Sequence, residues 1–337
     1  MESNEPKVVV IGGGRGTSTV LQGLKKHTSA LTAIVTMFDS GGSSGLLQKE
    51  FGYPPLGDLR KCLWSLGKED ELAGPMRELI DFRFSEDTSL NGHSLGNLLL
   101  AALTTLGEDL ERAIDDMARL LQITGRVVPV ALERADLCAE LGDGRTLRGE
   151  AKIDLRGEHS PRIERIFLEP SVSANPRAID AILEADVVVL GPGDLYTSII
   201  PNLLAAGIPQ ALATTRATRI YVCNLMTKLG ETDGFKASDF VREMLRYIGG
   251  PHLDWAVINS KVISAPVLEA YRREAAEPVE FDLEAVQSYL PGVFATALAD
   301  EQPKVKHDVE RIAETVLTIS RIGRASHVLI DRSGQRS

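Results

Sequence analysis

Cysteine is scarce in this 337-residue sequence: Cys62, Cys138 and Cys223 lie far apart and form no Cys-x-x-Cys pair. Such an odd, scattered set is typical of reduced thiols that pack in the core of a cytosolic protein. Long apolar runs are also missing, since no stretch approaches the roughly 18 apolar residues that a membrane span requires. Residues 1–6 are polar and lack the apolar core of a signal peptide. We therefore expect a cytoplasmic protein with no membrane span.

Positive charge is in deficit as well, because 37 Lys and Arg stand against 47 Asp and Glu and leave a net charge of −10. Neutralising phosphate groups along a polymer or a lipid surface requires clustered Lys and Arg. The composition therefore argues against nucleic acid or an anionic membrane as a general partner, although a local cationic pocket is compatible with it. With 43% hydrophobic residues and no internal repeat, the chain can bury one large core or two modest ones.

The sequence is organised around its first strand and the turn that leaves it. Residues 7–11 contain four consecutive β-branched residues, and an apolar helical pattern follows over 19–26. The turn between them comprises Gly12, Gly13, Gly14, Arg15, Gly16 and Thr17. Backbone N–H groups at the start of a helix favour an anion, and glycine lets a phosphate approach them, so this pattern predicts a phosphate-binding turn. The Rossmann fingerprint is incomplete, because Thr17 stands where its third glycine belongs, and a purely structural tight turn is the alternative.

A second glycine-rich loop follows the next predicted strand, at 31–38. Its members are Asp39, Ser40, Gly41, Gly42, Ser43, Ser44 and Gly45. An acid at the end of this strand binds ribose hydroxyls in dinucleotide folds, and small side chains beside it favour a second ligand loop, with a flexible linker as the alternative. Asp58 is predicted to cap the following helix, and Arg60 in its first turn would then lie near Asp39. An acid and a guanidinium so placed could hold a polar ligand.

A third polar loop opens a very apolar helix that begins near Leu95. Ser94 or Asn91 is predicted to cap this helix, and Asn97 belongs to the same candidate site. His93 is predicted to face a cleft as a hydrogen-bond donor or acceptor, with a structural role as the alternative.

Residues 126–169 differ in texture from the rest of the chain. Short stretches with turn signals between them occur at 127–132, 137–141, 146–153 and 163–168. Several short strands without intervening helices predict a β-rich insertion or an antiparallel extension of the sheet.

The opening pattern recurs in the second half of the chain. A helix at 176–185 and a strand at 186–190 lead into another glycine turn. The candidate ligand residues of this turn are Gly191, Gly193, Asp194, Tyr196, Thr197 and Ser198. Because ligands bind in the crevice at the carboxyl ends of parallel strands, we predict a second phosphate or polyol cradle that faces the first. Two more strands are predicted at 208–214 and 220–226, the latter bringing Asn224 and Thr227 to the same edge.

The remaining pattern completes an α/β chain. Helices are predicted at 69–90, 108–124, 237–247, 283–289 and 306–322, and a strand at 255–259. We therefore predict a doubly wound, mostly parallel, Rossmann-like sheet in one domain over residues 7–322 that includes the β-rich insertion 126–169. Residues 1–6 are predicted to be disordered, residues 323–337 to form a C-terminal tail, and residues 332–337 within it to be frayed.

Five motifs together resemble the gluconeogenesis factor family (YvcK-like), which is related to 2-phospho-L-lactate transferase (CofD-like). These motifs are Gly12-Gly-Gly-Arg-Gly-Thr17, Asp39-Ser-Gly-Gly-Ser-Ser-Gly45, Asn91-Gly-His-Ser-Leu-Gly-Asn97, Gly191-Pro-Gly-Asp-Leu-Tyr-Thr-Ser198 and Tyr221-Val-Cys-Asn-Leu-Met-Thr227. The resemblance covers residues 7–322 and departs from the family at Arg15, where threonine is usual, and at Asp194, where serine or asparagine is common.

The resemblance implies a cytoplasmic regulatory protein that binds a UDP sugar such as UDP-N-acetylglucosamine. Its implied role is in cell shape and wall synthesis during gluconeogenic growth, with regulatory protein partners; a homo-oligomer is compatible with the sequence. The transferase relatives imply the alternative, a magnesium-dependent transfer of a nucleotide-activated phospholactate-like group. In that alternative Asp39 and Asp58 would hold Mg²⁺, and His93 or Arg60 would serve the transferred group. A dinucleotide-dependent dehydrogenase is least favoured, because the fingerprint is incomplete.

Overall fold

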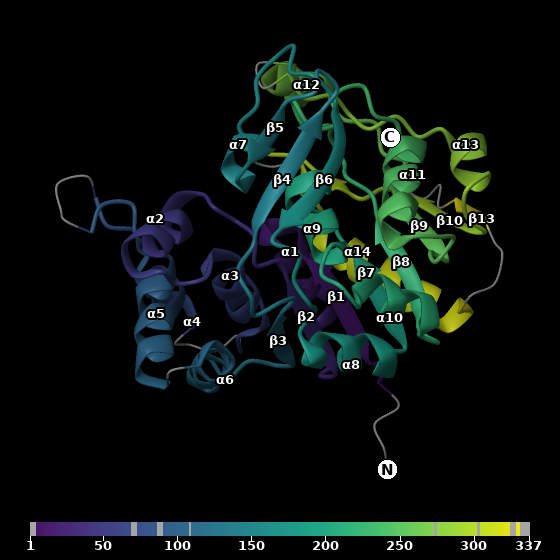
Figure 1. Ribbon diagram of the computed structural model, residues 1–337. Helices are drawn as coiled ribbons and strands as arrows, with labels where there is room; N and C mark the ends of the chain where they lie inside the picture. The colour runs from purple at the N-terminus through teal and green to yellow at the C-terminus, as the bar shows by residue number, and fades with distance from the viewer. Residues whose placement is uncertain are drawn as a thin grey trace.

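A computed structural model describes residues 5–68, 73–85, 90–107, 109–272, 275–301, 304–323 and 328–330. Its centre is an eight-stranded sheet in which all neighbouring strands are parallel (Figure 1). In spatial order the strands are β13 (Val328–Ile330), β10 (Gly292–Thr296), β9 (Trp255–Asn259), β8 (Thr218–Val222), β7 (Val187–Leu190), β1 (Val8–Gly12), β2 (Leu31–Val35) and β3 (Arg126–Pro129). The predicted doubly wound α/β fold is confirmed.

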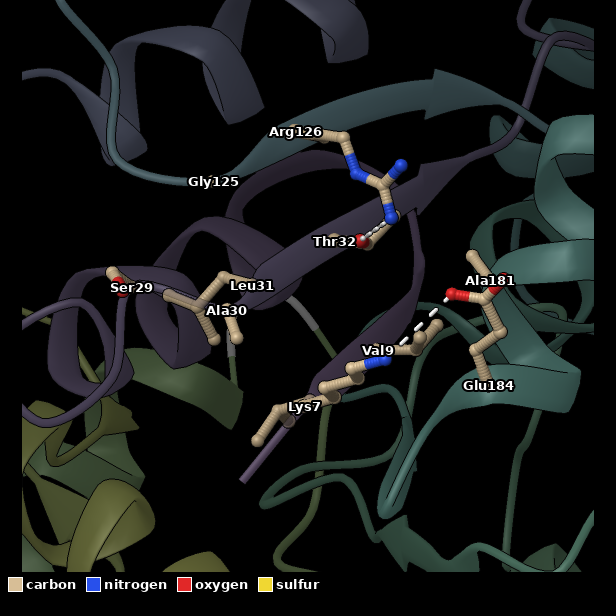
Figure 2. Close-up of a pocket in the computed structure, with 11 residues that line it drawn as sticks. Lys7, Val9, Ser29, Ala30, Leu31, Thr32, Gly125, Arg126, Ala181 and Glu184 are labelled. Carbon is tan, nitrogen blue, oxygen red and sulfur yellow. Dashed lines mark hydrogen bonds and ion pairs between the residues drawn. The ribbon is translucent and has the colours of Figure 1, made fainter. Parts of the chain in front are cut away.

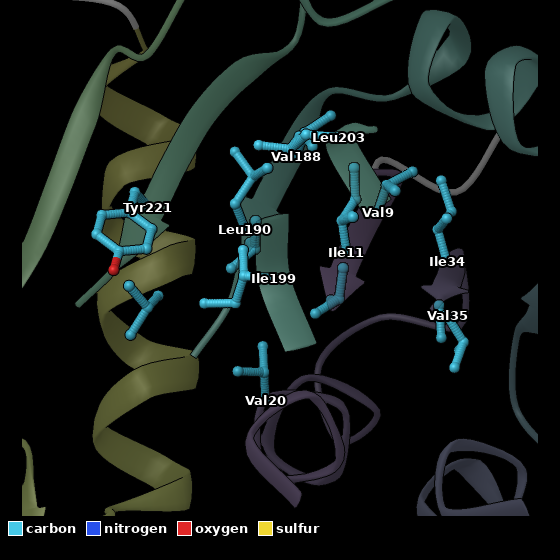
Figure 3. Close-up of a cluster of buried hydrophobic side chains, with 14 of the residues drawn as sticks. Val9, Ile11, Val20, Ile34, Val35, Val188, Leu190, Ile199, Leu203 and Tyr221 are labelled. Atoms are coloured by element: carbon cyan, nitrogen blue, oxygen red, sulfur yellow. The ribbon is translucent and has the colours of Figure 1, made fainter. Parts of the chain in front are cut away.

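The central strands are apolar along their whole length because helices cover both faces of the sheet. All five residues of β1 are buried, as are the four of β7. Figure 3 shows Val9 and Ile11 beside Val188 and Leu190 of the neighbouring strand, with Val20 of the first helix below them. The continuous β-branched runs in the sequence therefore mark the middle of the core.

The order of the strands reverses between β1 and β7. From β1 the chain first moves outward through β2 to β3, and it then returns to the other side of β1 with β7 and continues to β10. In a doubly wound sheet the crevice at such a switch point, outside the carboxyl ends of the strands, is where ligands bind. The glycine turns after β1 and β7 leave the sheet at this point.

Helices lie on both faces of the sheet (Figure 1). On one face α1 packs against α3 and α14, and on the other α8 and α10 pack together while α9 contacts β1. The helices are α1 (Gly14–Leu24), α2 (Gly42–Phe51), α3 (Gly57–Leu66), α4 (Ala73–Asp81), α5 (Leu95–Gly107), α6 (Leu110–Leu120), α7 (Glu150–Asp154), α8 (Pro176–Glu184), α9 (Ile200–Leu203), α10 (Ile208–Thr214), α11 (Ala237–Ile248), α12 (Ala265–Arg272), α13 (Leu283–Gln287) and α14 (Val309–Ile322), with a π-helical turn, η1 (Leu195–Ile199), before α9. In the part of the chain that is described, no helix is long and apolar enough to cross a membrane.

A small antiparallel sheet stands apart from the central one. It contains β5 (Thr146–Arg148), β4 (Asp136–Leu141) and β6 (Ile163–Glu169), and α7 follows β5. Figure 1 shows this sheet and α7 on the side of the molecule away from the N-terminus. A second short pair, β11 (Ala299–Asp300) and β12 (Lys306–His307), follows β10.

The structure corrects several predicted elements. Residues 208–214 form the helix α10 rather than a strand, because Pro209 lies in the first turn and Gln210 accepts the Gly207 N–H at 3.2 Å. The first stretch assigned to the insertion is β3, which pairs in parallel with β2 in the central sheet. Residues 150–153, the end of the stretch predicted as strand, lie in the helix α7. The segment 328–330, placed in the C-terminal tail, forms the edge strand β13.

Candidate functional site

The two glycine turns at the switch point are in direct contact. Gly16 lies in the first turn of α1, and a Cβ built on it would be 2.1 Å from the carbonyl oxygen of Pro192 in the turn after β7. Only glycine permits this approach. Gly14 has a φ of +65°, a left-handed conformation that also favours glycine. The spacing of glycines in the first motif therefore serves both the shape of the turn and its contact with the second turn.

A cavity of about 840 Å³ lies beside this contact. Its wall is formed by the first turns of α1, the turn after β7, the segment after β8, the end of α7 and the short strand β12. Six of the residues singled out from the sequence line it, namely Arg15, Gly16, Gly193, Asp194, Asn224 and Thr227. Three separate motifs thus converge on one space at the edge of the sheet.

The charge of this cavity is opposite in sign to that of the whole chain. Of the described residues that line it, Asp154 and Asp194 are carboxylates and Arg15, Arg156, Lys228, Lys304 and Lys306 are cationic, while Lys306 also pairs with Asp300 at 3.2 Å. Arg15 is exposed, and no acid of the described ranges pairs with its guanidinium. In a chain with a net charge of −10, such a local excess of cations indicates a site for an anion. We refer to this space as the cationic cavity.

Lys228 is held by three carboxylates at the wall of the cationic cavity. Its Nζ pairs with Asp154, with Asp194 Oδ2 at 2.7 Å and with Glu231 Oε1 at 3.3 Å. The Glu231 side chain is fully buried, and this burial raises its pKa to about 7. The contacts join the insertion, through Asp154, to the turn after β7. Sequence reasoning missed this cluster because its members are far apart in the chain.

Tyr196 and Thr197, predicted as ligand residues, use their polar groups inside the protein. The backbone N–H of Tyr196 and the Thr197 hydroxyl donate to Glu231 at 3.3 and 3.1 Å. The Tyr196 hydroxyl donates to Glu243 at 3.2 Å. The Glu231 carboxylate therefore already binds the first turn of η1, at the place where the sequence pattern predicts a bound phosphate.

Asn224 and His307 give the cationic cavity a neutral section of wall. Asn224 Oδ1 is buried, and within the described ranges no group donates a hydrogen bond to it. His307 Nε2 donates to the Cys223 carbonyl at 3.1 Å. Burial lowers the pKa of His307 to about 4, so the ring is neutral and its Nδ1 carries no proton. His307 was not singled out from the sequence, where it falls at the predicted start of the last helix.

A group of acids lies on the other side of the first glycine turn. A Cβ on Gly13 would be 2.6 Å from Asp58 Oδ2, and the Asp58 carboxylate pairs with Lys61 at 2.9 Å. Asp39 accepts the Gly41 N–H at 2.8 Å and is hydrogen-bonded to Glu150 of α7. Burial raises the pKa of both carboxyls, and for Glu150 burial and the neighbouring Asp39 charge raise it to about 8. We call Asp39, Asp58 and Glu150, with Lys61, the acidic group.

Arg60 does not face Asp39, in contrast to the prediction. It is 8% exposed, donates from Nε to Asn97 Oδ1 at 3.1 Å and pairs with Asp81. Asn97 in turn donates to Ser43 Oγ at 3.1 Å. This chain of contacts fixes α3, α5 and α2 to one another, because a buried guanidinium requires partners.

The other predicted site residues fall outside the cationic cavity. Asp58 lies within the first turn of α3 without capping it, whereas Ser94 Oγ accepts the Asn97 N–H at 3.3 Å as predicted for a cap. His93 is buried, and Asn91 is exposed. Gly12, Thr17 and Gly191 are buried, Ser198 is half-buried and Gly42 is exposed. The side chain of Ser44 lies outside the described residues.

A smaller cavity of about 200 Å³ occurs at the opposite edge of the sheet (Figure 2). Figure 2 shows Lys7, Thr32 and Arg126 at the amino ends of β1, β2 and β3, where Arg126 donates to Thr32 at 3.5 Å. Lys7 and Glu184 form an ion pair at 3.8 Å there. Ligands of doubly wound sheets bind at the carboxyl edge, so this cavity is not the candidate site.

Comparison with known proteins agrees with the motif resemblance. A family model described as 2-phospho-L-lactate transferase CofD matches residues 8–299. The chain belongs to the CofD family. Among relatives of this CofD-family chain, the "Gluconeogenesis factor" of Halalkalibacterium halodurans is 40% identical over 312 residues, which are 92% of this chain and 95% of the relative. That of Bacillus subtilis is 38% identical over 317 residues, or 94% and 98% of the two chains.

A crystal structure supports the family assignment. A member of the UPF0052 family from Bacillus halodurans is 39% identical and matches this CofD-family chain with a TM-score of 0.88. The match covers 93% of this chain and 99% of that chain. Identity and fold therefore agree over nearly the whole molecule.

The magnesium-dependent alternative that the resemblance implies calls for a place where a cation could bind. Asp154, Asp194 and Glu231 are close enough to hold a metal ion. They do not fit one as the structure stands, because the Lys228 ammonium contacts all three. The acidic group also offers the carboxylate oxygens that Mg²⁺ prefers, but among the described residues its three acids do not form a set whose ligand atoms all lie within 4.8 Å of one another.

Proposed function

We propose that the chain is a cytoplasmic regulatory protein that binds a UDP sugar of the UDP-N-acetylglucosamine type in the cationic cavity. Its proposed role is in cell shape and wall synthesis during gluconeogenic growth, exerted through partner proteins. The names of the relatives from Bacillus subtilis and Halalkalibacterium halodurans support the link to gluconeogenesis.

The observation that carries the proposal is the cationic cavity itself. Among its described residues, this acidic chain places five cationic side chains around one space at the topological switch point, of which Lys228 is paired with three carboxylates and Lys306 with Asp300. A volume of about 840 Å³ lies within the range of small-molecule sites. A diphosphate with a sugar at each end is a ligand of matching size and charge.

Arg15 is the residue on which the phosphate contact depends most. It projects from the first turn of α1, where the helix dipole also favours an anion, and it has no carboxylate partner in the described ranges. The backbone N–H groups of the turn at 13–17 lie at the same helix end. Guanidinium and dipole act in the same direction, so both favour a phosphate of the ligand here.

Calorimetric titration with UDP-N-acetylglucosamine tests the proposal. We expect saturable binding by the wild-type protein and a Kd about tenfold or more higher for Arg15→Ala, since a charge-assisted hydrogen bond is lost. Arg119→Ala is the matched control, because Arg119 is exposed on α6 and does not line the cavity. Failure of the wild-type protein to bind any UDP sugar would refute the proposal.

The alternative is a magnesium-dependent transferase, which the acidic group favours. Asp39 and Asp58 would hold the ion beside the glycine turn, and its charge would offset that of a phosphoryl group in transfer. Incubation with Mg²⁺ and nucleotide-activated phospholactate, followed by measurement of nucleotide release, separates the two functions. Turnover that Asp58→Asn abolishes would favour the transferase, whereas binding without turnover favours the regulator.

A further inference from the structure

The neutral section of the cavity wall, formed by Asn224 and His307, offers hydrogen-bond acceptors to a ligand. Asn224 Oδ1 is buried and receives no hydrogen bond from the described residues. His307 donates its single N–H, at Nε2, to the Cys223 carbonyl, so Nδ1 is left as an acceptor. Because Cys223 directly precedes Asn224, one backbone segment brings the two side chains to the same part of the cavity wall.

A buried acceptor without a partner costs free energy, and a bound ligand can remove that cost by supplying a donor. Phosphate oxygens carry no proton to donate at neutral pH, so the phosphates of the ligand do not suit this wall. Hydroxyl groups do, because each supplies one O–H. The neutral section of the wall therefore suits the hydroxyl groups of the ligand, whereas the cations suit its phosphates.

The position of the wall indicates which part of the ligand that is. His307 follows Lys306 directly in β12, and Lys304 and Lys306 both line the cavity. A group bound at Asn224 and His307 thus lies next to cations suited to a phosphate. In a nucleotide sugar the groups attached to the diphosphate are the ribose on one side and the hexose on the other, while the base is one ring further away.

We propose that Asn224 and His307 form a sugar subsite that accepts hydrogen bonds from hydroxyl groups of the ribose or the terminal hexose of the ligand. This inference rests on the proposed binding of a nucleotide sugar in the cationic cavity. It assigns specificity to two neutral side chains and leaves the cations to bind the diphosphate.

The test compares Asn224 variants across ligands that lack one sugar group at a time. The Kd values of wild type, Asn224→Leu and Asn224→Asp are measured by calorimetry for UDP-N-acetylglucosamine, UDP and 2′,3′-dideoxy-UDP. For Asn224→Leu we expect a Kd about tenfold or more higher for every ligand that carries the recognised hydroxyls, and a change of less than about twofold for a ligand that lacks them. Asn224→Asp keeps an acceptor, so it should keep the wild-type ratio between ligands.

The ligand arms identify the sugar. A loss with UDP-N-acetylglucosamine but not with UDP assigns the hexose, and a loss with UDP but not with 2′,3′-dideoxy-UDP assigns the ribose. His307→Phe, which removes the Nδ1 acceptor, should reproduce the same pattern. His27→Phe is the matched control, because His27 is exposed beyond the end of α1, at the opposite edge of the sheet from the cavity.

Two failures can be told apart. If wild type binds UDP-N-acetylglucosamine but Asn224→Leu lowers affinity for all three ligands by the same factor, the sugar subsite is refuted and the proposed function stands. If wild type binds none of the three, the proposed function is refuted and the subsite with it. Thermal unfolding of each variant shows whether a loss of binding reflects a loss of folded protein.

Discussion

The two sides of the first glycine turn differ in charge although they share one backbone segment. On the side of β7 and β8 the turn borders the cationic cavity, with Arg15 at its edge. On the side of β2 it borders the acidic group, where Asp58 lies against Gly13. The same turn therefore separates a space suited to an anion from one suited to a cation.

This difference shows that a glycine turn by itself does not determine what binds beside it. The turns after β1 and β7 both read as phosphate cradles from the sequence. In the structure the first turn of η1 carries the internal carboxylate of Glu231 instead. The side chains that distant elements bring to a turn decide the sign of its ligand.

The largest expected effect comes from separating the two turns. Gly16→Ala places a Cβ against the Pro192 carbonyl, which is backbone and cannot move aside cheaply. We expect a loss of about 3 kcal/mol in the free energy of unfolding, measured by urea denaturation, together with lost ligand binding.

Gly74→Ala is the matched control for this change. Gly74 also lies in a helix, and a Cβ there meets no atom of the described residues within 4 Å. It should be neutral or more stable by up to about 1 kcal/mol, because alanine is the better helix former. Equal stability of the two alanine variants would contradict the close contact of the turns.

Lys228→Met should have the next largest effect, because it removes the cation among three carboxylates. Glu231 would remain fully buried without its ammonium partner. We expect the free energy of unfolding to fall by about 2 to 3 kcal/mol in urea denaturation. Adding Glu231→Gln to this variant should restore part of the loss, and a strictly additive double variant would show that the pair is not coupled.

Glu150→Gln tests the acidic group through its pH dependence. The pKa of Glu150 in the folded protein, about 8, lies above its unfolded value of 4.5, so its contribution to stability is present below about pH 4.5 and is lost as the pH rises through 8. Wild type should therefore lose stability relative to Glu150→Gln between about pH 4.5 and pH 8, by at most about 1.4 kcal/mol per pH unit. The exposed Glu158→Gln is the control, and stability curves of wild type and Glu150→Gln that stay parallel would contradict this account.

The smallest effect concerns salt and the cationic cavity. Raising NaCl from about 50 to about 500 mM should weaken binding of UDP-N-acetylglucosamine several-fold, because exposed cations such as Arg15 are screened. The Kd for Mg²⁺ binding to the acidic group is not expected to show the same dependence on NaCl concentration. A Kd for the UDP sugar that does not change with salt would argue against an electrostatic contribution from the cavity.

Much of the fold could be predicted from local patterns. Continuous β-branched runs such as residues 7–11 mark strands buried on both faces, and glycines after them mark the carboxyl edge of the sheet. The helix at 208–214 was missed although Gly207 and Pro209 signal a helix start, because the apolar run itself also suits a strand. The edge strand β13 is three residues long and is formed only by pairing with β10.

The sequence by itself determined the parallel α/β architecture and the glycine turns, because these depend on hydrophobic period and on residues without a Cβ. Only the tertiary structure decided that Arg60 is an internal anchor, that Glu231 occupies the first turn of η1 and that His307 reaches the cavity. These outcomes depend on which charged and polar groups meet across separations of tens of residues. A local pattern fixes where a side chain leaves the backbone, whereas burial and charge pairing fix what it can bind.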